Sequence, residues 1–181
     1  MSDTGPPPLH EAALIVPVPE AEPWVGELRQ LYDPSAAVGV PAHITINYPF
    51  TPHLGRPLEA RLQLAALLSG FRQFSFALCE ICTFPGVIYL APEPEAPFVA
   101  LAEAVASLFP DSPPYEGRFA DFVPHLTVAQ VDETAVAAVM TEVSERVSAV
   151  LPVPCQALHV MLIDNSDTVW KSYAVFPLRP S

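Results

Sequence analysis

The sequence predicts an α+β fold that is bilobal, with two half-domains related by a pseudo-twofold axis. We expect mainly antiparallel sheets, helices on their outer faces and a central cleft. Three observations support this. The chain of 181 residues is 51% apolar, which is about one domain's worth of core-forming material. Strand-like and helix-like patterns alternate along it. A His-x-Thr pattern occurs at residues 43–45 and again at 125–127, in equivalent places of two similar halves.

Each half shows the order strand, helix, strand with His-x-Thr, helix, strand. Short apolar or alternating runs predict strands at 12–18, 43–48, 74–83, 87–90, 125–129, 158–163 and 169–176. Apolar residues at helical spacing predict helices at 22–32, 58–68, 98–108 and 132–143. The predicted half-repeats span about 11–84 and 86–177 within one domain of residues 10–181. Residues 1–9 are expected to form a flexible leader.

Local signals mark where these elements begin and end. Pro23 suits the first turn of the first helix, and Gly70 and Pro110 end the second and third helices. Asp132 is a candidate N-cap for the last helix. Residues 164–167, Asp-Asn-Ser-Asp, are rich in turn-forming residues and predict a hairpin between the last two strands.

The composition limits the range of partners. The chain has 8 Lys and Arg against 20 Asp and Glu, a net charge of −12. Proteins that bind long nucleic acid usually carry a basic stripe, so such binding is excluded, whereas a small nucleotide or an RNA terminus remains possible. No apolar run reaches the roughly 20 residues of a membrane span. The first residues lack the basic and apolar segments of a signal peptide. We therefore expect a cytoplasmic monomer with no membrane partner.

The three cysteines do not predict a disulfide framework, because their number is odd and the chain is expected to be cytosolic. Cys79 and Cys82 have the spacing of a metal or redox motif, but they lie inside a predicted strand and no second pair follows. We interpret them as packed thiols, with a metal or redox role as the weaker alternative. No cofactor is predicted.

The two His-x-Thr segments are the candidate site. Side chains two apart on a strand share a face, so His43 and Thr45 point one way while their aliphatic neighbours point into a core. The same holds for His125 and Thr127. A twofold arrangement would bring two imidazoles and two hydroxyls together. One imidazole can remove a proton and the other can donate one, while hydroxyls can bind phosphate oxygens. Metal ligation by the two histidines is a weaker alternative, since zinc needs three or four ligands.

The paired motifs resemble the signature of the 2H phosphoesterase superfamily, whose bacterial members include 2′-5′ RNA ligase and cyclic phosphodiesterase-like proteins. The resemblance covers about residues 11–177 and extends to Tyr48-Pro-Phe, to Val87-Ile-Tyr-Leu and to the run from Phe122 to Thr127. It implies a bilobal fold with a cleft. It also implies His43 and His125 as the acid–base pair, with Thr45 and Thr127 on the phosphate. Many RNA-processing members have a basic residue where this chain has Gln130, which favours a smaller substrate.

Five further residues are candidates for substrate binding. Aromatic rings near the motifs could stack on a base, and an arginine could contact phosphate. These candidates are Tyr48, Phe50, Arg118, Phe122 and Tyr173.

We expect a metal-independent phosphodiesterase that opens a 2′,3′-cyclic phosphate or a related nucleotide or RNA-end phosphodiester, with 2′-5′ ligation as the possible reverse reaction. The alternative is a nucleotide-binding module of the same fold with little turnover. A metal-dependent hydrolase is the third and weakest hypothesis.

Overall fold

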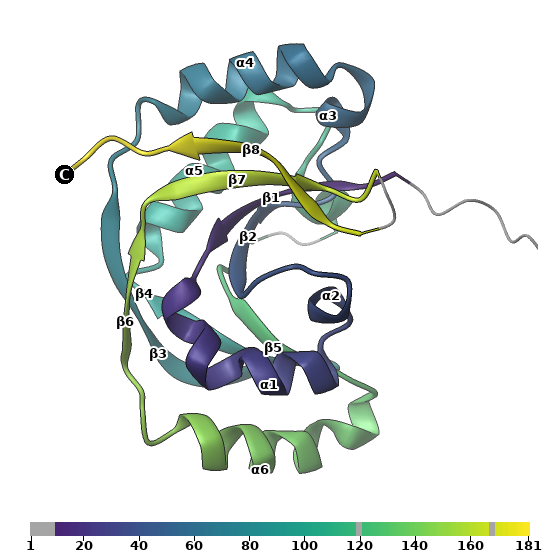
Figure 1. Cartoon of the computed structure of the whole chain (residues 1–181), viewed down its shortest axis with the longest axis vertical. Coiled ribbons are helices and arrows are strands. Elements are labelled where there is room, and N and C mark those ends of the chain that lie inside the picture. The colour runs from purple at the N-terminus through teal and green to yellow at the C-terminus, as the bar shows by residue number, and fades with distance from the viewer. Residues whose placement is uncertain (1–9, 119–120, 167–168) are drawn as a thin grey trace, which may run out of the picture.

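A computed structural model describes residues 10–118, 121–166 and 169–181, so the predicted leader lies outside the described residues. The α+β prediction is confirmed, because the described chain forms two four-stranded antiparallel sheets with helices packed on them (Figure 1). The main strands and helices lie where the sequence patterns predict them.

The two sheets have matching strand orders. The first has the order β2-β1-β7-β8 and consists of β1 (Ala12–Pro17), β2 (His43–Asn47), β7 (His159–Asp164) and β8 (Lys171–Pro177). The second has the order β5-β4-β3-β6 and consists of β3 (Phe74–Phe84), β4 (Val87–Glu93), β5 (Leu126–Gln130) and β6 (Val153–Ala157). The motif strands β2 and β5 therefore occupy the same edge position in their sheets, each beside the strand that precedes it in the sequence.

Helices cover one face of each sheet, and each sheet is covered in part by a helix that lies in the sequence between strands of the other sheet. The six α-helices in the described residues are α1 (Glu22–Tyr32), α2 (Pro34–Ala37), α3 (Thr51–Gly55), α4 (Pro57–Leu68), α5 (Ala96–Leu108) and α6 (Val136–Val147). Short 3-10 turns η1 (Pro19–Ala21), η2 (Pro114–Gly117) and η3 (Glu133–Ala135) lie between them. Helix α1 packs against β5 and α6, whereas α5 packs against β2 and α4. Helices α1 and α5 thus each pack on the sheet that does not contain the strands flanking them in the sequence, while α4 and α6 lie at opposite ends of the view in Figure 1.

One continuous apolar core joins the two sheets to their helices. The aliphatic residues of the motif strands, Ile44 and Ile46 on β2 and Leu126 and Val128 on β5, are fully buried in this core. Their period of two leaves the intervening histidine and threonine side chains on the opposite face of each strand.

The sheets do not coincide with the predicted half-repeats. Strand β3 belongs to the first half of the sequence but pairs with β4 in the second sheet, and the late strands β7 and β8 complete the first sheet. The reason is a two-residue turn between Phe84 and Val87, which forces β3 and β4 to pair as neighbours. Gly86 in this turn has a φ of +75°, and a Cβ there would lie 2.9 Å from the carbonyl oxygen of Val131.

The N-cap expectation for Asp132 is wrong in detail. Asp132 precedes η3, makes no side-chain capping bond, and α6 begins only at Val136. The intervening turn shifts the start of the α-helix beyond reach of the aspartate.

Candidate active site

The first motif lies on β2 as the strand period predicts. His43 and Thr45 are partly exposed, between fully buried aliphatic residues. His43 Nδ1–H donates to the carbonyl oxygen of Pro41 at 2.7 Å. This bond joins the ring to the backbone two residues before it and so limits the ring's rotation.

The second motif repeats this arrangement at β5. His125, just before the strand begins, donates from Nδ1–H to the carbonyl oxygen of Val123 at 2.8 Å. Thr127 is also partly exposed, and the aliphatic residues on either side of it are buried. Both histidines are therefore held by the same bond to the residue at the same offset.

These two bonds set the tautomer of each ring. A backbone carbonyl can only accept, so Nδ1 must carry the proton in both rings. In the neutral form Nε2 then holds the lone pair. Each ring consequently presents Nε2, the nitrogen that can exchange a proton with a substrate.

Burial dominates the electrostatics of both rings. It lowers the pKa of His43 to about 4, against a smaller opposing effect of the bond to Pro41. The Arg29 and His125 charges lower this pKa further, whereas Asp33 raises it. Burial also lowers the pKa of His125. Strands β2 and β5 pack together and the charge of His125 lowers the pKa of His43, so the two motifs lie near each other.

A buried arginine positions the segment before His43. Arg29 is 2% exposed and binds Asp33 Oδ2 through Nη2 at 2.9 Å and Nε at 3.1 Å. Its Nη1 donates to the carbonyl oxygen of Val40 at 3.2 Å, next to the Pro41 carbonyl that holds His43. Arg29 was not predicted as a site residue from the sequence. Its i,i+4 spacing to Asp33 was the available signal.

Two aromatic rings support His125 from the second sheet. Phe84 and Tyr89 are stacked, with ring centroids 4.4 Å apart. The His125 ring meets both edge-on, at 5.3 and 5.4 Å. Tyr89 is also the cross-strand neighbour of Thr127. Phe84 and Tyr89 were not predicted as site residues, because their contact with His125 depends on how β3, β4 and β5 pair in the sheet.

The structure does not bring all the predicted binding residues to this site. The prediction for Phe50 is wrong, since its side chain is fully buried and packs edge-on against Phe109 at 5.1 Å. Tyr173 packs against His53 at 4.2 Å. His53 is hydrogen-bonded to Asp164, and the cross-strand neighbour of Asp164 is Ala12, a residue of the main core. Tyr173 therefore lies with His53 on the face of the first sheet that the helices cover. His43 and Thr45 are on the opposite face.

The remaining candidates have different surroundings. Phe122 is partly buried and packs against the main core. Arg118 is exposed and forms an ion pair with Glu116. Tyr48 lies at the end of β2, where it packs with Trp170 at 6.4 Å between ring centroids on the small apolar cluster that includes Ile15. Since Ile15 is the cross-strand neighbour of Thr45, Tyr48 is the aromatic candidate nearest the first motif in the sheet.

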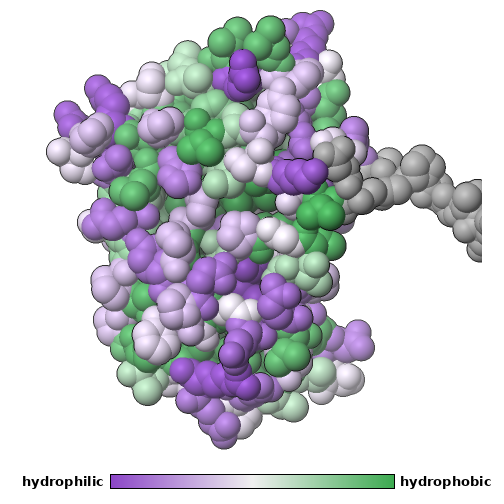
Figure 2. Space-filling model, in the orientation of Figure 1, coloured by the Kyte–Doolittle hydropathy of each residue, from purple (hydrophilic) through white to green (hydrophobic). Residues whose placement is uncertain are grey.

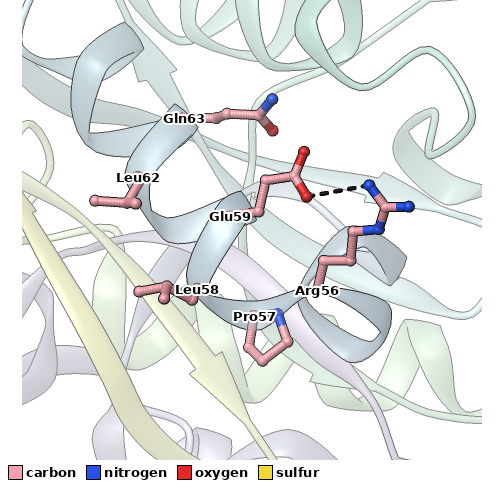
Figure 3. A pocket seen from close by; sticks show the side chains of 6 residues that line it. All are labelled: Arg56, Pro57, Leu58, Glu59, Leu62 and Gln63. Carbon is pink, nitrogen blue, oxygen red and sulfur yellow. Dashed lines mark hydrogen bonds and ion pairs between the residues drawn. The ribbon is translucent and has the colours of Figure 1, made fainter.

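A surface pocket lies apart from the motifs. It is lined by Arg56, Pro57, Leu58, Glu59, Leu62 and Gln63 at the start of α4, with Arg56 and Glu59 paired at 3.1 Å (Figure 3). Apolar atoms gather at this end of the molecule, where Leu54, Leu58 and Leu62 are exposed (Figure 2). The pocket is on the outer side of a helix that covers the first sheet, so it does not include the histidines.

Two features of the described residues concern membrane and metal binding. None of the helices described is long and apolar enough to cross a membrane. Within the same residues, no three His, Cys, Asp or Glu side chains are grouped so that they could hold a metal ion.

Comparison with known families gives a clear assignment. The sequence model of the 2′-5′ RNA ligase superfamily matches residues 17–167, most of the chain. The chain belongs to this superfamily. The resemblance of the paired motifs to the 2H phosphoesterase superfamily is thereby confirmed. A comparison with curated proteins gave no match.

Solved structures show that the superfamily fold extends over nearly the whole chain. Escherichia coli LigT complexed with 3′-AMP has a TM-score of 0.60 at 14% identity, covering 93% of this chain and 98% of LigT. TT0787 of Thermus thermophilus has a TM-score of 0.54 at 19% identity, covering 94% and 99%. A structure described as a phosphoesterase has a TM-score of 0.56 at 16% identity, covering 94% and 99%. At these identities the likeness supports the fold alone.

Proposed function

We propose that this protein is a phosphodiesterase that opens a 2′,3′-cyclic phosphate, or a related nucleotide or RNA-end cyclic phosphodiester, by acid–base catalysis with His43 and His125. The observation that carries the proposal is the matched Nδ1–H to carbonyl bond of the two rings. It gives both histidines the same tautomer and leaves Nε2 of each available for proton transfer.

The proposed reaction needs one proton acceptor and one proton donor. Nε2 of one neutral ring removes a proton from water as its oxygen forms a bond to phosphorus. The other ring, protonated, gives its Nε2 proton to the ribose oxygen as that oxygen's bond to phosphorus breaks. The product is a phosphate monoester, and which histidine acts as acid decides whether it is the 2′ or the 3′ isomer. The Thr45 and Thr127 hydroxyls donate to the non-bridging oxygens.

Because the pKa values of both histidines are lowered, we expect one ring to become protonated only when substrate is bound. Both imidazoles favour the neutral form in the free protein, since burial disfavours their charged forms. An anionic phosphate between the rings opposes this effect and favours protonation of one of them. The substrate itself therefore completes the acid–base pair.

Charge and pairing favour a small substrate. The chain has a net charge of −12, and four of its arginines pair with carboxylates of the same chain. They are Arg29, Arg56, Arg118 and Arg146. Without a basic track, a mononucleotide or a short RNA end fits better than a long strand. LigT has been crystallised with 3′-AMP, NADP+ and ATP, which supports a small nucleotide ligand here. By microscopic reversibility, the same groups could form a 2′-5′ linkage.

A nucleotide-binding module with little turnover is the second candidate. It is favoured by one observation, the lowered pKa of both histidines, which disfavours the proton donor in the free site. The module would retain the threonine contacts to phosphate and lack a proton donor even when occupied.

Turnover of adenosine 2′,3′-cyclic phosphate separates these candidates. Pure protein would be assayed with and without EDTA, beside His43→Gln and His125→Gln. The exposed His10 gives the control His10→Gln. We expect turnover that resists EDTA, falls roughly 100-fold to 10,000-fold in either motif variant and is unchanged in the control. Binding without turnover supports the module, and activity lost with EDTA and restored by a divalent ion contradicts the metal-independent mechanism.

A further inference from the structure

The loop from α5 to β5 lies against the end of the first motif strand. Within it, Ser112 accepts at its carbonyl oxygen from Asn47 Nδ2 at 2.9 Å, next to the end of β2. The Ser112 hydroxyl donates to the carbonyl oxygen of Pro49 at 3.1 Å and accepts from the backbone N–H of Thr51 at 3.2 Å. These bonds fix residues 110–118, which we call the strap, to the segment that leaves β2.

The strap contains an unusual backbone turn. Tyr115 and Glu116 have φ angles of 52° and 57°, and Gly117 follows at 71°. Side chains other than glycine rarely adopt this left-handed region, and such residues are concentrated at functional sites. The backbone N–H of Tyr115 donates to the carbonyl oxygen of Tyr48 at 2.6 Å, which holds the turn beside β2.

This turn directs the Tyr115 side chain toward the site. Its phenol is hydrogen-bonded to Thr45, one of the two threonines that would hold the phosphate. Burial raises the pKa of Tyr115, so the phenol keeps its proton at neutral pH. A phenol oxygen that accepts from a threonine can still donate its own O–H.

We propose that Tyr115 is a further phosphate-binding residue, whose hydroxyl donates to a non-bridging oxygen of the substrate beside Thr45. The proposal rests on the proposed function and deepens it. The corresponding loop of the other half, residues 33–42, contains no aromatic residue. The Thr45 side of the site thus has a phenol donor with no counterpart in residues 33–42, which would orient an otherwise symmetric phosphate site.

Steady-state kinetics of Tyr115→Phe test this assignment, because the substitution keeps the ring and removes only the hydroxyl. With adenosine 2′,3′-cyclic phosphate we expect KM to rise about 10-fold to 100-fold, the range for one hydrogen bond to a charged group, with kcat within about threefold of wild type. The matched control is Tyr32→Phe, which removes a hydroxyl bonded to Glu142 at 2.6 Å between two helices. It is expected to leave KM unchanged.

A binding measurement keeps the proposal testable without turnover. Titration calorimetry with 3′-AMP should show Kd rising in the same proportion as KM, while Tm stays within about 2 °C. If the wild-type protein binds 3′-AMP but does not hydrolyse adenosine 2′,3′-cyclic phosphate, the proposed catalysis is overturned. The ratio of Kd between Tyr115→Phe and wild type then still decides the role of Tyr115. Equal KM and Kd for Tyr115→Phe and wild type overturn the Tyr115 assignment alone. A wild type that neither binds nor turns over overturns both.

Discussion

Burial of His43 predicts a specific dependence of stability on pH. The pKa of this ring is about 4 in the folded protein, against about 6.5 for an ordinary histidine. The perturbation is His43→Gln, which removes the titrating group while keeping a polar side chain of similar length.

The sign follows from proton counting. Between pH 6.5 and 4 the unfolded chain binds a proton at residue 43 that the folded protein does not bind, so the free energy of unfolding falls as the pH falls. At pH 4.5 these two pKa values correspond to a loss of about 2.5 kcal/mol relative to pH 7. In His43→Gln this part of the loss is absent. Carboxylates titrate in both proteins, so their effect largely cancels from the difference.

Urea unfolding followed by circular dichroism measures the quantity directly. Wild type and His43→Gln would be unfolded at pH 7.0 and pH 4.5, and their difference in unfolding free energy compared. We expect this difference to move by about 2.5 kcal/mol in favour of the variant at the lower pH. Parallel pH dependence of the two proteins would refute the reasoning, because it would mean that His43 titrates normally in the fold.

Three further predictions concern activity and packing. The maximum of kcat/KM should lie below about pH 6.5, because burial lowers the pKa of both histidines and the profile reports the free protein; an optimum at pH 7.5 or above in a rate profile would contradict this. Asp33→Ala should lower the free energy of unfolding by about 3 kcal/mol, since it removes the carboxylate 2.9 Å from the buried Arg29 and leaves only the more distant Glu22 at 3.8 Å, and a loss under 1 kcal/mol in urea melts would speak against that pairing. Phe50→Leu should lower the free energy of unfolding by about 1–3 kcal/mol and leave KM unchanged, because the fully buried side chain loses volume and its edge-on contact with Phe109; a clear rise in KM would restore Phe50 as a substrate contact.

Most strands and the longer helices of the fold could be predicted from local sequence pattern. The missed strand β6 shows what such a pattern does not contain. The predicted strands and helices rest on periods of two and 3.6, which depend only on which face is buried. Strand β6 was missed because it is short and contains Pro154. A proline is tolerated there, since β6 is an edge strand of its sheet. Edge position is a property of the tertiary structure and leaves no clear mark on five residues.

In the candidate site, too, some residues could be predicted from local pattern and others depend on tertiary contacts. His43, Thr45, His125 and Thr127 could be grouped because two repeated motifs carry their own geometry. Arg29 and Tyr115 act on β2 from a helix and from a strap, and their roles depend on contacts between segments distant in sequence or on a backbone turn. Phe50 shows the opposite error, in which an aromatic residue beside a motif is a core residue. Closeness in sequence to a motif did not distinguish an aromatic ring that faces the candidate site from one that faces the core.

The exchange of strands between the sheets has a consequence for biosynthesis. The sheet that carries His43 also needs β7 and β8, which lie more than 100 residues after β2 in the sequence. On the ribosome, the first motif therefore emerges long before β7 and β8, and its sheet can be completed only after both of these strands have been made. Until β7 is made, nascent chains expose the edge of β1 that β7 pairs with in the folded protein, together with the apolar side chains that this pairing helps to cover.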